Sequence, residues 1–228
     1  MKRLLLASVG LIVLVAAPAL AADIPARMPT KAPAMAPGYN WSGWYIGING
    51  GGGFGRSRWT DTATGFTTGG FNLRGGLVGG TIGANWQTGA WVFGLEGDAD
   101  WSSIRGSTAV GCVVNCETKN NFLATVRGRA GYAFGSVLPY VTGGLAVGDI
   151  DAGGRGLPHQ STTKAGWTAG GGVEWALAGP WTAKVEYLYV DLDKMSCSIA
   201  ACGGTGATDV TLRSNVVRAG VNYRFSPR

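Results

Sequence analysis

Charged side chains recur at every second position in several segments of the sequence. Glu96, Asp98 and Asp100 alternate with small residues, and Arg127 and Arg129 do the same further along the chain. Residues two apart in a β-strand lie on one face, and carboxylates and guanidinium groups on facing strands form charge-assisted hydrogen bonds. Buried charges are tolerated only when they are paired in this way. We therefore predict that five acidic and five basic residues form a network in the lumen of a barrel. The alternative is that the same ten side chains are solvated on the surface of a soluble sheet. The ten residues are Glu96, Asp98, Asp100, Glu174, Glu186, Arg127, Arg129, Lys184, Arg218 and Arg224.

The cysteines form two local pairs. Cys112 and Cys116 lie in one polar segment, and Cys197 and Cys202 lie in another. The chain begins with a pattern typical of export, described below, and exported proteins meet an oxidising compartment. We predict one disulfide within each pair. The alternative is a CxxxC metal site, which has no histidine close by in the sequence.

His159 is the single histidine of the chain. A catalytic histidine needs an orienting acid and a nucleophile, and its neighbours Pro158 and Gln160 supply neither. We interpret it as a solvated loop residue, with a haem or metal contact as the alternative. Residues 50–55 match the pattern GxGxxG. This pattern indicates a phosphate-binding loop only when a helix follows it. No helix is expected after residue 55, so we do not interpret the match as a phosphate site. The sequence predicts no enzymatic activity and no cofactor.

Eight segments with a two-residue period are expected to position these side chains. In the clearest of them, Trp91 and Phe93 lie on one face, and Glu96 and Asp98 on the other. Tyr140 breaks the alternation of its segment, so its facing stays open. The predicted strands cover residues 44–54, 74–87, 91–101, 120–134, 138–149, 164–177, 181–191 and 210–225.

The connections between these segments alternate in length. Short turns are expected near 87–90, 135–137 and 178–180, and long polar or glycine-rich loops near 55–73, 102–120, 150–163 and 192–209. An even-stranded antiparallel barrel with both ends on one side has this alternation.

The composition indicates which face of the sheet contacts lipid and which face is polar. The chain has 228 residues, of which 40 are glycine, and only 14% are charged, against roughly 25% in an average soluble domain. The apolar faces carry bulky side chains, too large to fill the interior of one eight-stranded barrel. The opposite faces carry glycine, threonine, asparagine and charges, which fit such an interior. We therefore expect the apolar faces to contact lipid.

Aromatic residues are expected in two belts on the apolar face, as in membrane barrels. One belt lies beside the short turns, and the other at the opposite ends of the strands. The first comprises Trp44, Trp86, Trp91, Trp175, Trp181 and Phe225, and the second Trp101, Phe122, Trp167 and Tyr189.

The first 40 residues differ from the rest of the chain. A basic start, an apolar stretch and Ala19-Leu20-Ala21 are typical of a secretory signal peptide, which we assign to residues 1–21. Prolines recur every four residues in the predicted periplasmic linker, 22–40. The predicted barrel spans 41–228. The formal net charge of +6 is scattered along the chain, so we expect no nucleic-acid partner.

Three motifs resemble a known family. Residues 23–27 (DIPAR), 39–47 (YNWSGWYIG) and 217–225 (VRAGVNYRF) are similar to the small outer-membrane immunogenic proteins of alphaproteobacteria, which belong with opacity-type and OmpA-like barrels. The resemblance implies an integral protein of the outer membrane, exported to the periplasm and inserted by the barrel assembly machinery. Such proteins usually end in an aromatic residue, whereas Ser226-Pro227-Arg228 follow Phe225 here. We predict that deleting these three residues does not reduce insertion.

The sequence thus predicts an all-β, eight-stranded antiparallel up-and-down transmembrane barrel with short periplasmic turns and four long extracellular loops. The main hypothesis is that the protein has a structural role in the cell envelope and makes surface contacts through its loops. The barrel would sit in outer-membrane lipid, and its loops would contact lipopolysaccharide, host surfaces or neighbouring cells. The alternatives are a small porin-like channel and a soluble ligand-binding β-barrel.

Overall fold

The computed structural model describes residues 39–110, 115–154, 156–202 and 206–225. The predicted signal peptide, most of the predicted linker, Cys112 and the Ser226–Arg228 tail lie outside the described residues. What is described is one β-structure with a short helix, α1 (Ile199–Cys202).

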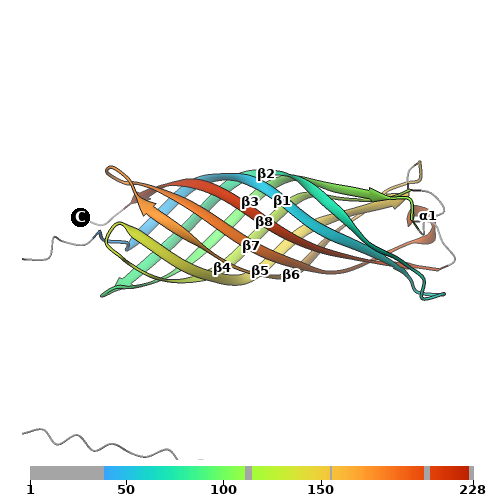
Figure 1. Ribbon diagram of the computed structural model, residues 1–228, viewed down its shortest axis with the longest axis horizontal. Helices are drawn as coiled ribbons and strands as arrows, with labels where there is room; N and C mark the ends of the chain where they lie inside the picture. Colours follow the sequence, from blue (N-terminus) through green and yellow to red (C-terminus); the bar gives the residue numbers. More distant parts are fainter. Residues whose placement is uncertain (1–38, 111–114, 155, 203–205, 226–228) are drawn as a thin grey trace, which may run out of the picture. The chain divides into compact units, whose positions relative to one another are not determined.

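Eight antiparallel strands close into a barrel in which each strand pairs with its neighbours in sequence and β1 pairs with β8 (Figure 1). The predicted fold is therefore confirmed. The strands are β1 (Gly43–Asp61), β2 (Thr67–Thr88), β3 (Trp91–Thr108), β4 (Cys116–Tyr132), β5 (Val137–Gly154), β6 (Gln160–Ala176), β7 (Trp181–Cys197) and β8 (Thr208–Phe225). Among the described residues, no helix is long and apolar enough to cross a membrane.

The strands are longer than predicted, and the predicted loop boundaries are wrong. Most of the segments expected to be loops are paired strand, and the connections are only 62–66, 109–115, 155–159 and 198–207. The prediction followed apolar residues on the outer face. Beyond the second aromatic belt the outer face is polar, so the same strands continue with polar residues outside and apolar residues inside.

Two bulges add to this difference. In β4 both Asn121 and Phe122 are exposed, and in β7 both Asp193 and Lys194 are exposed. The registers shift at these places, between Lys119 and Leu123 and between Leu192 and Met195. A bulge adds an unpaired residue, so inward positions change from odd to even numbers or the reverse, and a strict two-residue period ends there.

We name the two ends of the barrel by their connections. The turn end carries the short turns, Gly43 and Phe225, and the loop end carries the four connections given above. Between the two aromatic belts lies the membrane band. On β3 it runs over eleven residues, from Trp91 to Trp101. The ten steps between them span about 25 Å along the barrel axis at a rise of about 3.4 Å and a tilt of about 40°. This matches the apolar band of outer-membrane barrels.

In the membrane band the outer face is apolar and the inner face polar. Phe93, Leu95 and Trp101 are 52%, 57% and 73% exposed, whereas Glu96 and Asp100 are 2% and 1% exposed. Tyr140, whose facing the sequence left open, is buried inside the barrel.

Between the second belt and the loop end, the barrel continues as the loop-end section, and its faces are reversed. Its outer face exposes Arg56, Arg74 and Arg105. Its interior is an apolar cluster that includes Trp59, Leu73, Ile104, Ile150, Met195 and Leu212, which we call the loop-end core.

Candidate functional site

Arg127 on β4 lies at the centre of the charged interior of the membrane band. Its Nη2 lies 2.6 Å from Glu96 Oε1 and 2.6 Å from Asp98 Oδ2, both on β3. Its Nη1 donates to Glu186 Oε1 on β7, 2.9 Å away. One guanidinium thus joins strands that are not neighbours in the sheet.

Arg218 on β8 forms a second centre beside the first. Its Nη2 lies 2.7 Å from Glu186 Oε2 and 2.9 Å from Asp98 Oδ1. Its Nη1 lies 2.8 Å from Asp100 Oδ2. Because Glu186 and Asp98 contact both arginines, the two centres form one continuous network.

Toward the turn end the network extends to Glu174 on β6. Arg129 Nη2 lies 2.6 Å from Glu174 Oε2, and Lys184 Nζ lies 2.8 Å from Glu96 Oε2. Thr182 Oγ1 also donates to Glu174 Oε1 at 2.6 Å. Side chains from β3, β4, β6, β7 and β8 therefore cross-link the interior.

Two tyrosines that the sequence analysis did not select complete the network. Tyr45 OH donates to Glu96 Oε2 at 2.7 Å, and Tyr140 OH donates to Glu186 Oε1 at 3.0 Å. The Arg129 guanidinium also lies 4.1 Å from the centre of the Tyr140 ring, a cation–π contact. For Tyr45 the signal was available, because it alternates with the outward-facing Trp44 and Ile46.

Glycines on β2 leave room for this network. A Cβ added at Gly83 would overlap the Tyr45 ring, and one added at Gly79 would overlap the Asp100 carboxylate. These positions require close approach and not a special backbone conformation. They explain why β2 contributes space, and not ionised groups, to the interior.

Arg224 lies apart from the other nine predicted network residues, at the turn end. Its Nη2 donates to the backbone carbonyls of Trp41 and Ser42, and its guanidinium lies 5.3 Å from the Trp41 ring centre. No carboxylate of the described residues forms an ion pair with it. Four cations therefore face five carboxylates in the network, with two tyrosine hydroxyls as further donors.

Trp41 closes the interior at the turn end. It is fully buried and packs with Val92 and Leu138, and its Nε1 donates to the carbonyl of Gly135 at 3.1 Å. Tyr39 packs edge-on against it, with ring centres 4.7 Å apart. Burial raises the pKa of the Tyr39 phenol above its usual value, against the opposing effect of Arg224, so this phenol stays neutral at physiological pH.

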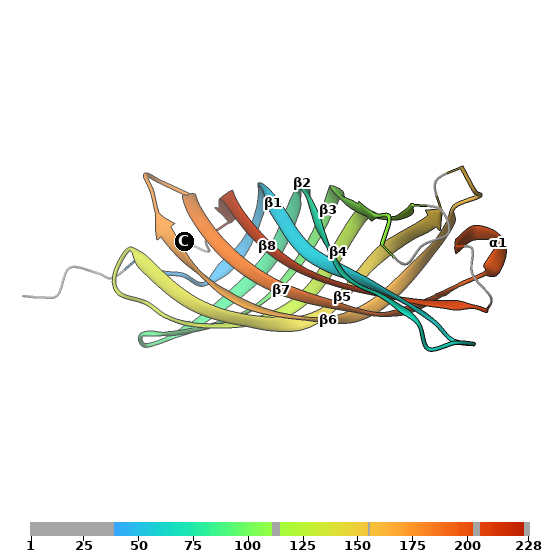
Figure 2. The same cartoon turned by 45° about the vertical axis from the view of Figure 1, so that its right-hand side comes forward.

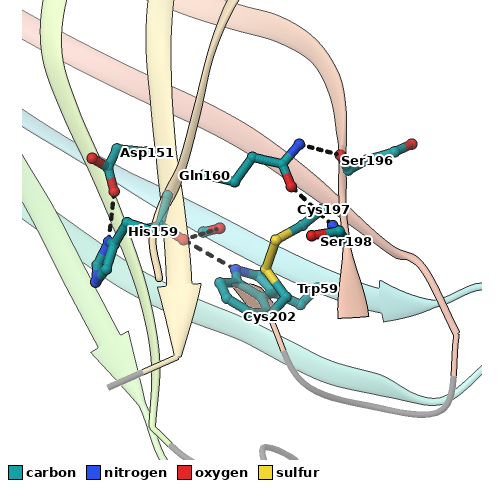
Figure 3. The surroundings of a disulfide bond; sticks show 10 residues. Trp59, Asp151, His159, Gln160, Ser196, Cys197, Ser198 and Cys202 are labelled. Atoms are coloured by element: carbon teal, nitrogen blue, oxygen red, sulfur yellow. Dashed lines mark hydrogen bonds and ion pairs between the residues drawn. A yellow bond between two sulfur atoms is a disulfide. The ribbon is translucent and has the colours of Figure 1, made fainter. Parts of the chain in front are cut away.

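The loop-end core closes the other end. Trp59 is buried there, and its Nε1 donates to Thr118 Oγ1 at 3.0 Å. The disulfide between Cys197 and Cys202 lies beside Trp59 and joins β7 to α1 (Figure 3). Cys116 is also disulfide-bonded, and Cys112, its predicted partner, lies outside the described residues.

His159 lies at the loop end and is exposed. Its Nδ1 lies 2.7 Å from Asp151 Oδ1 (Figure 3). The residues next to His159 in the sequence do not include this acid because Asp151 is eight residues away, across the β5–β6 connection. The contact with Asp151 orients the His159 ring just before the start of β6.

The barrel interior is thus filled by three layers: Trp41 with its apolar neighbours, the ion-pair network, and the loop-end core. In the network, the groups that could transfer protons or attack a substrate are bonded to one another and buried. Each cation of the network lies within ion-pair distance of at least one carboxylate.

Comparison with known proteins identifies the family of this chain. The family described as "Outer membrane protein beta-barrel domain" matches residues 7–225. The 31 kDa outer-membrane immunogenic protein of Brucella melitensis is 36% identical over 99% of this chain and 100% of its own length. The 22 kDa outer membrane protein of Rhizobium leguminosarum is 32% identical over 83% of this chain and 80% of its own length.

Among solved structures, neisserial surface protein A is similar at 16% identity and a TM-score of 0.45, over 81% of this chain and 98% of that one. The family match and the relatives agree with the residue-level interpretation of an apolar, lipid-facing outer surface. The chain belongs to the outer membrane protein β-barrel family, and it is an integral β-barrel of the outer membrane.

Proposed function

We propose that this protein is a non-conducting, non-enzymatic barrel of the outer membrane that presents its loop-end section at the cell surface. The observation that carries the proposal is the filled interior. Arg127 and Arg218 join β3, β4, β7 and β8 across the lumen, and apolar layers lie above and below them. A barrel filled in this way anchors and displays, and does not transport.

The orientation follows from the connections. Short turns face the periplasm and longer loops face outward in barrels of this kind. The turn end, with Trp41 and Phe225, then faces the periplasm. Residues 1–21 would be the export signal and 22–40 the periplasmic linker, and the barrel assembly machinery would insert the chain. The loop end would contact lipopolysaccharide, host surfaces or neighbouring cells.

A small porin-like channel is the second candidate. The buried amide of Asn85 has no hydrogen-bond partner among the described side chains and backbone groups, and such orphan groups mark places where interior water is expected. A channel needs a continuous path, however, and the ion-pair network lies across it.

Planar-bilayer recording tests the proposal. The wild-type protein is expected to give no reproducible conductance steps. The double variant Arg127→Ala/Arg218→Ala removes the two guanidinium groups that cross the lumen, and it should conduct if it still folds. Resistance to SDS before heating checks folding. Steady, uniform steps from the wild-type protein would overturn the proposal in favour of the channel.

A further inference from the structure

The outer face of the loop-end section carries a one-sided set of cations. We call it the basic strip. It consists of Arg56 and Arg58 on β1, Arg74 on β2, Arg105 on β3, Lys119 on β4 and Arg213 on β8. These five strands are consecutive around the barrel, and Figure 2 shows β8, β1, β2 and β3 side by side.

The strand register places like charges directly opposite one another. Arg74 pairs with Arg105, and Arg105 pairs with Lys119. Arg56 pairs with Arg213 on the other side of β1. Like charges at directly opposed positions destabilise a sheet, so this register has a cost that an external anion would remove.

The protein supplies few anions to the strip. Arg213 pairs with Asp191 at 3.0 Å, and Lys119 lies 3.8 Å from Glu117. Within the described part of the chain, the other four arginines form no ion pair. The remaining strands differ at the same level. β5 and β7 carry four aspartates, Asp149, Asp151, Asp191 and Asp193, with one exposed cation, Lys194, whereas the outer faces of the strands of the strip carry six cations with Glu117 and Asp209. The positive charge is therefore concentrated on one side of the barrel.

The height of the strip indicates what lies against it. Arg105 follows the belt residue Trp101 by four positions, which is roughly 10 Å along the barrel axis. On β1, Arg56 follows the exposed Phe54 by two positions. Guanidinium groups this close above the hydrocarbon boundary lie at the level of lipid headgroups. Arginine also matches phosphate oxygens in a bidentate manner.

We propose that the basic strip is a binding site for the phosphorylated headgroup of a glycolipid of the outer leaflet, namely lipopolysaccharide. Arg74 and Arg105 form its centre, flanked by Arg56, Arg58, Arg213 and Lys119. The phosphates neutralise the opposed cations, while the acyl chains lie on the apolar face below. This site rests on the outward orientation of the loop end given under the proposed function, and it explains why only one side of the barrel is basic.

The test uses the full mature chain, purified in a non-ionic detergent, and three probes. These are lipopolysaccharide with its lipid A phosphates intact, the same lipid after enzymatic dephosphorylation, and inorganic phosphate. Native mass spectrometry counts bound lipid at increasing concentration. The variant Arg74→Gln/Arg105→Gln removes the centre of the strip, and Lys194→Gln removes an exposed cation of β7 outside it.

We expect the wild-type protein and Lys194→Gln to bind the phosphorylated lipid equally. Arg74→Gln/Arg105→Gln should bind it at least tenfold more weakly, dephosphorylation should weaken wild-type binding to a similar extent, and millimolar inorganic phosphate should not displace the lipid. Equal binding by both variants, or equal binding of the dephosphorylated lipid, would overturn the site. Displacement by inorganic phosphate would show a free-anion site instead.

This outcome is independent of the conductance test. A barrel that conducts ions can still bind the lipid at its outer face, and a closed barrel can fail to bind it. SDS resistance of each variant before heating shows that a loss of binding is not a loss of folding.

Discussion

The membrane band and the loop-end section are parts of the same eight strands, but their chemistry is reversed. In the band, Val126 and Leu95 face outward and Arg127 and Glu96 face inward. In the loop-end section, Arg58 is exposed beside the buried Trp59. The same strands run through both regions, so the backbone does not account for the difference. What differs is the surroundings of the outer face: lipid around the band, and a polar environment around the loop-end section.

The difference shows that one barrel can be held together in two ways. Lipid offers no hydrophobic force that would drive apolar groups inward, so packing and hydrogen bonds hold the interior of the band together. Polar headgroups and water surround the loop-end section, where burying Trp59, Leu73 and Leu212 is favourable as in any soluble protein. The bulges at Asn121–Phe122 and Asp193–Lys194 lie where one arrangement changes to the other. In the first, Asp149 Oδ1 accepts from the backbone amides of Asn121 and Phe122 at 2.8 and 2.7 Å.

The largest expected effect comes from breaking the ion-pair network. Arg127→Met removes a guanidinium that contacts Glu96, Asp98 and Glu186, and it leaves these carboxylates buried with fewer partners. Loss of one member of a buried ion pair costs about 3–5 kcal/mol, so the free energy of unfolding should fall by about 4 kcal/mol. Urea unfolding in lipid vesicles, followed by tryptophan fluorescence, measures it.

The matched control for this variant is Arg213→Met. Arg213 also forms an ion pair with a carboxylate, but its side chain is 62% exposed, and exposed pairs contribute about 0–1 kcal/mol. Equal losses in the two variants would show that the interior network is not the stabilising element of the band.

A smaller and more local effect is expected in the loop-end core. Trp59→Ala leaves a cavity and removes the hydrogen bond to Thr118, and such truncations cost about 3–5 kcal/mol when the whole fold depends on the site. Here we expect the free energy of local opening of the loop-end section to fall by roughly 3 kcal/mol. Hydrogen exchange should rise in the amides of 55–61 and 208–212.

The band should remain protected in Trp59→Ala, and SDS resistance should persist. Arg58→Ala, one residue away on the outer face, is the control and should leave exchange unchanged. Exchange that rises throughout the barrel would mean that the two regions unfold as one unit, and the comparison would then be wrong.

The smallest expected effect comes from the disulfide. Cys197→Ser/Cys202→Ser removes a link between residues five positions apart. So short a loop restricts the unfolded chain only a little, and the disulfide therefore stabilises the folded segment by about 2 kcal/mol. We expect faster protease cleavage within 198–207 and no change in urea unfolding of the band. An equal loss of band stability would contradict this. Ala201→Ser, which keeps both cysteines, serves as the control.

The sequence predicts the membrane band well because both faces have a strong two-residue pattern there. Trp91, Phe93 and Leu95 alternate with residues that the structure places inside. Tyr45 could have been assigned to the interior from the same alternation. A pattern of charged residue types does not include tyrosine, although the Tyr45 hydroxyl donates to Glu96 in the network.

The loop-end section could not be predicted in the same way. Its apolar residues face inward and alternate with polar ones, which resembles a polar loop when an outward apolar face is expected. The bulges then shift the phase within β4 and β7. Trp41 lies outside any strand and has no periodic signal, so its closing role at the turn end depends on long-range contacts with Val92, Leu138 and Gly135.

Spin-label accessibility along the outer face of β1 tests the reversal most directly. Single cysteines at Ile46, Ile48, Phe54, Arg56 and Arg58, in a background without the native cysteines, carry nitroxide labels in lipid vesicles. Collisions with oxygen report lipid, and collisions with a water-soluble nickel complex report water. We predict oxygen-dominated signals from Ile46 through Phe54 and nickel-dominated signals at Arg58, with the change near Arg56. Oxygen-dominated signals at Arg58, or nickel-dominated signals at Ile48, would contradict the division of the barrel into a lipid-facing band and a water-facing section.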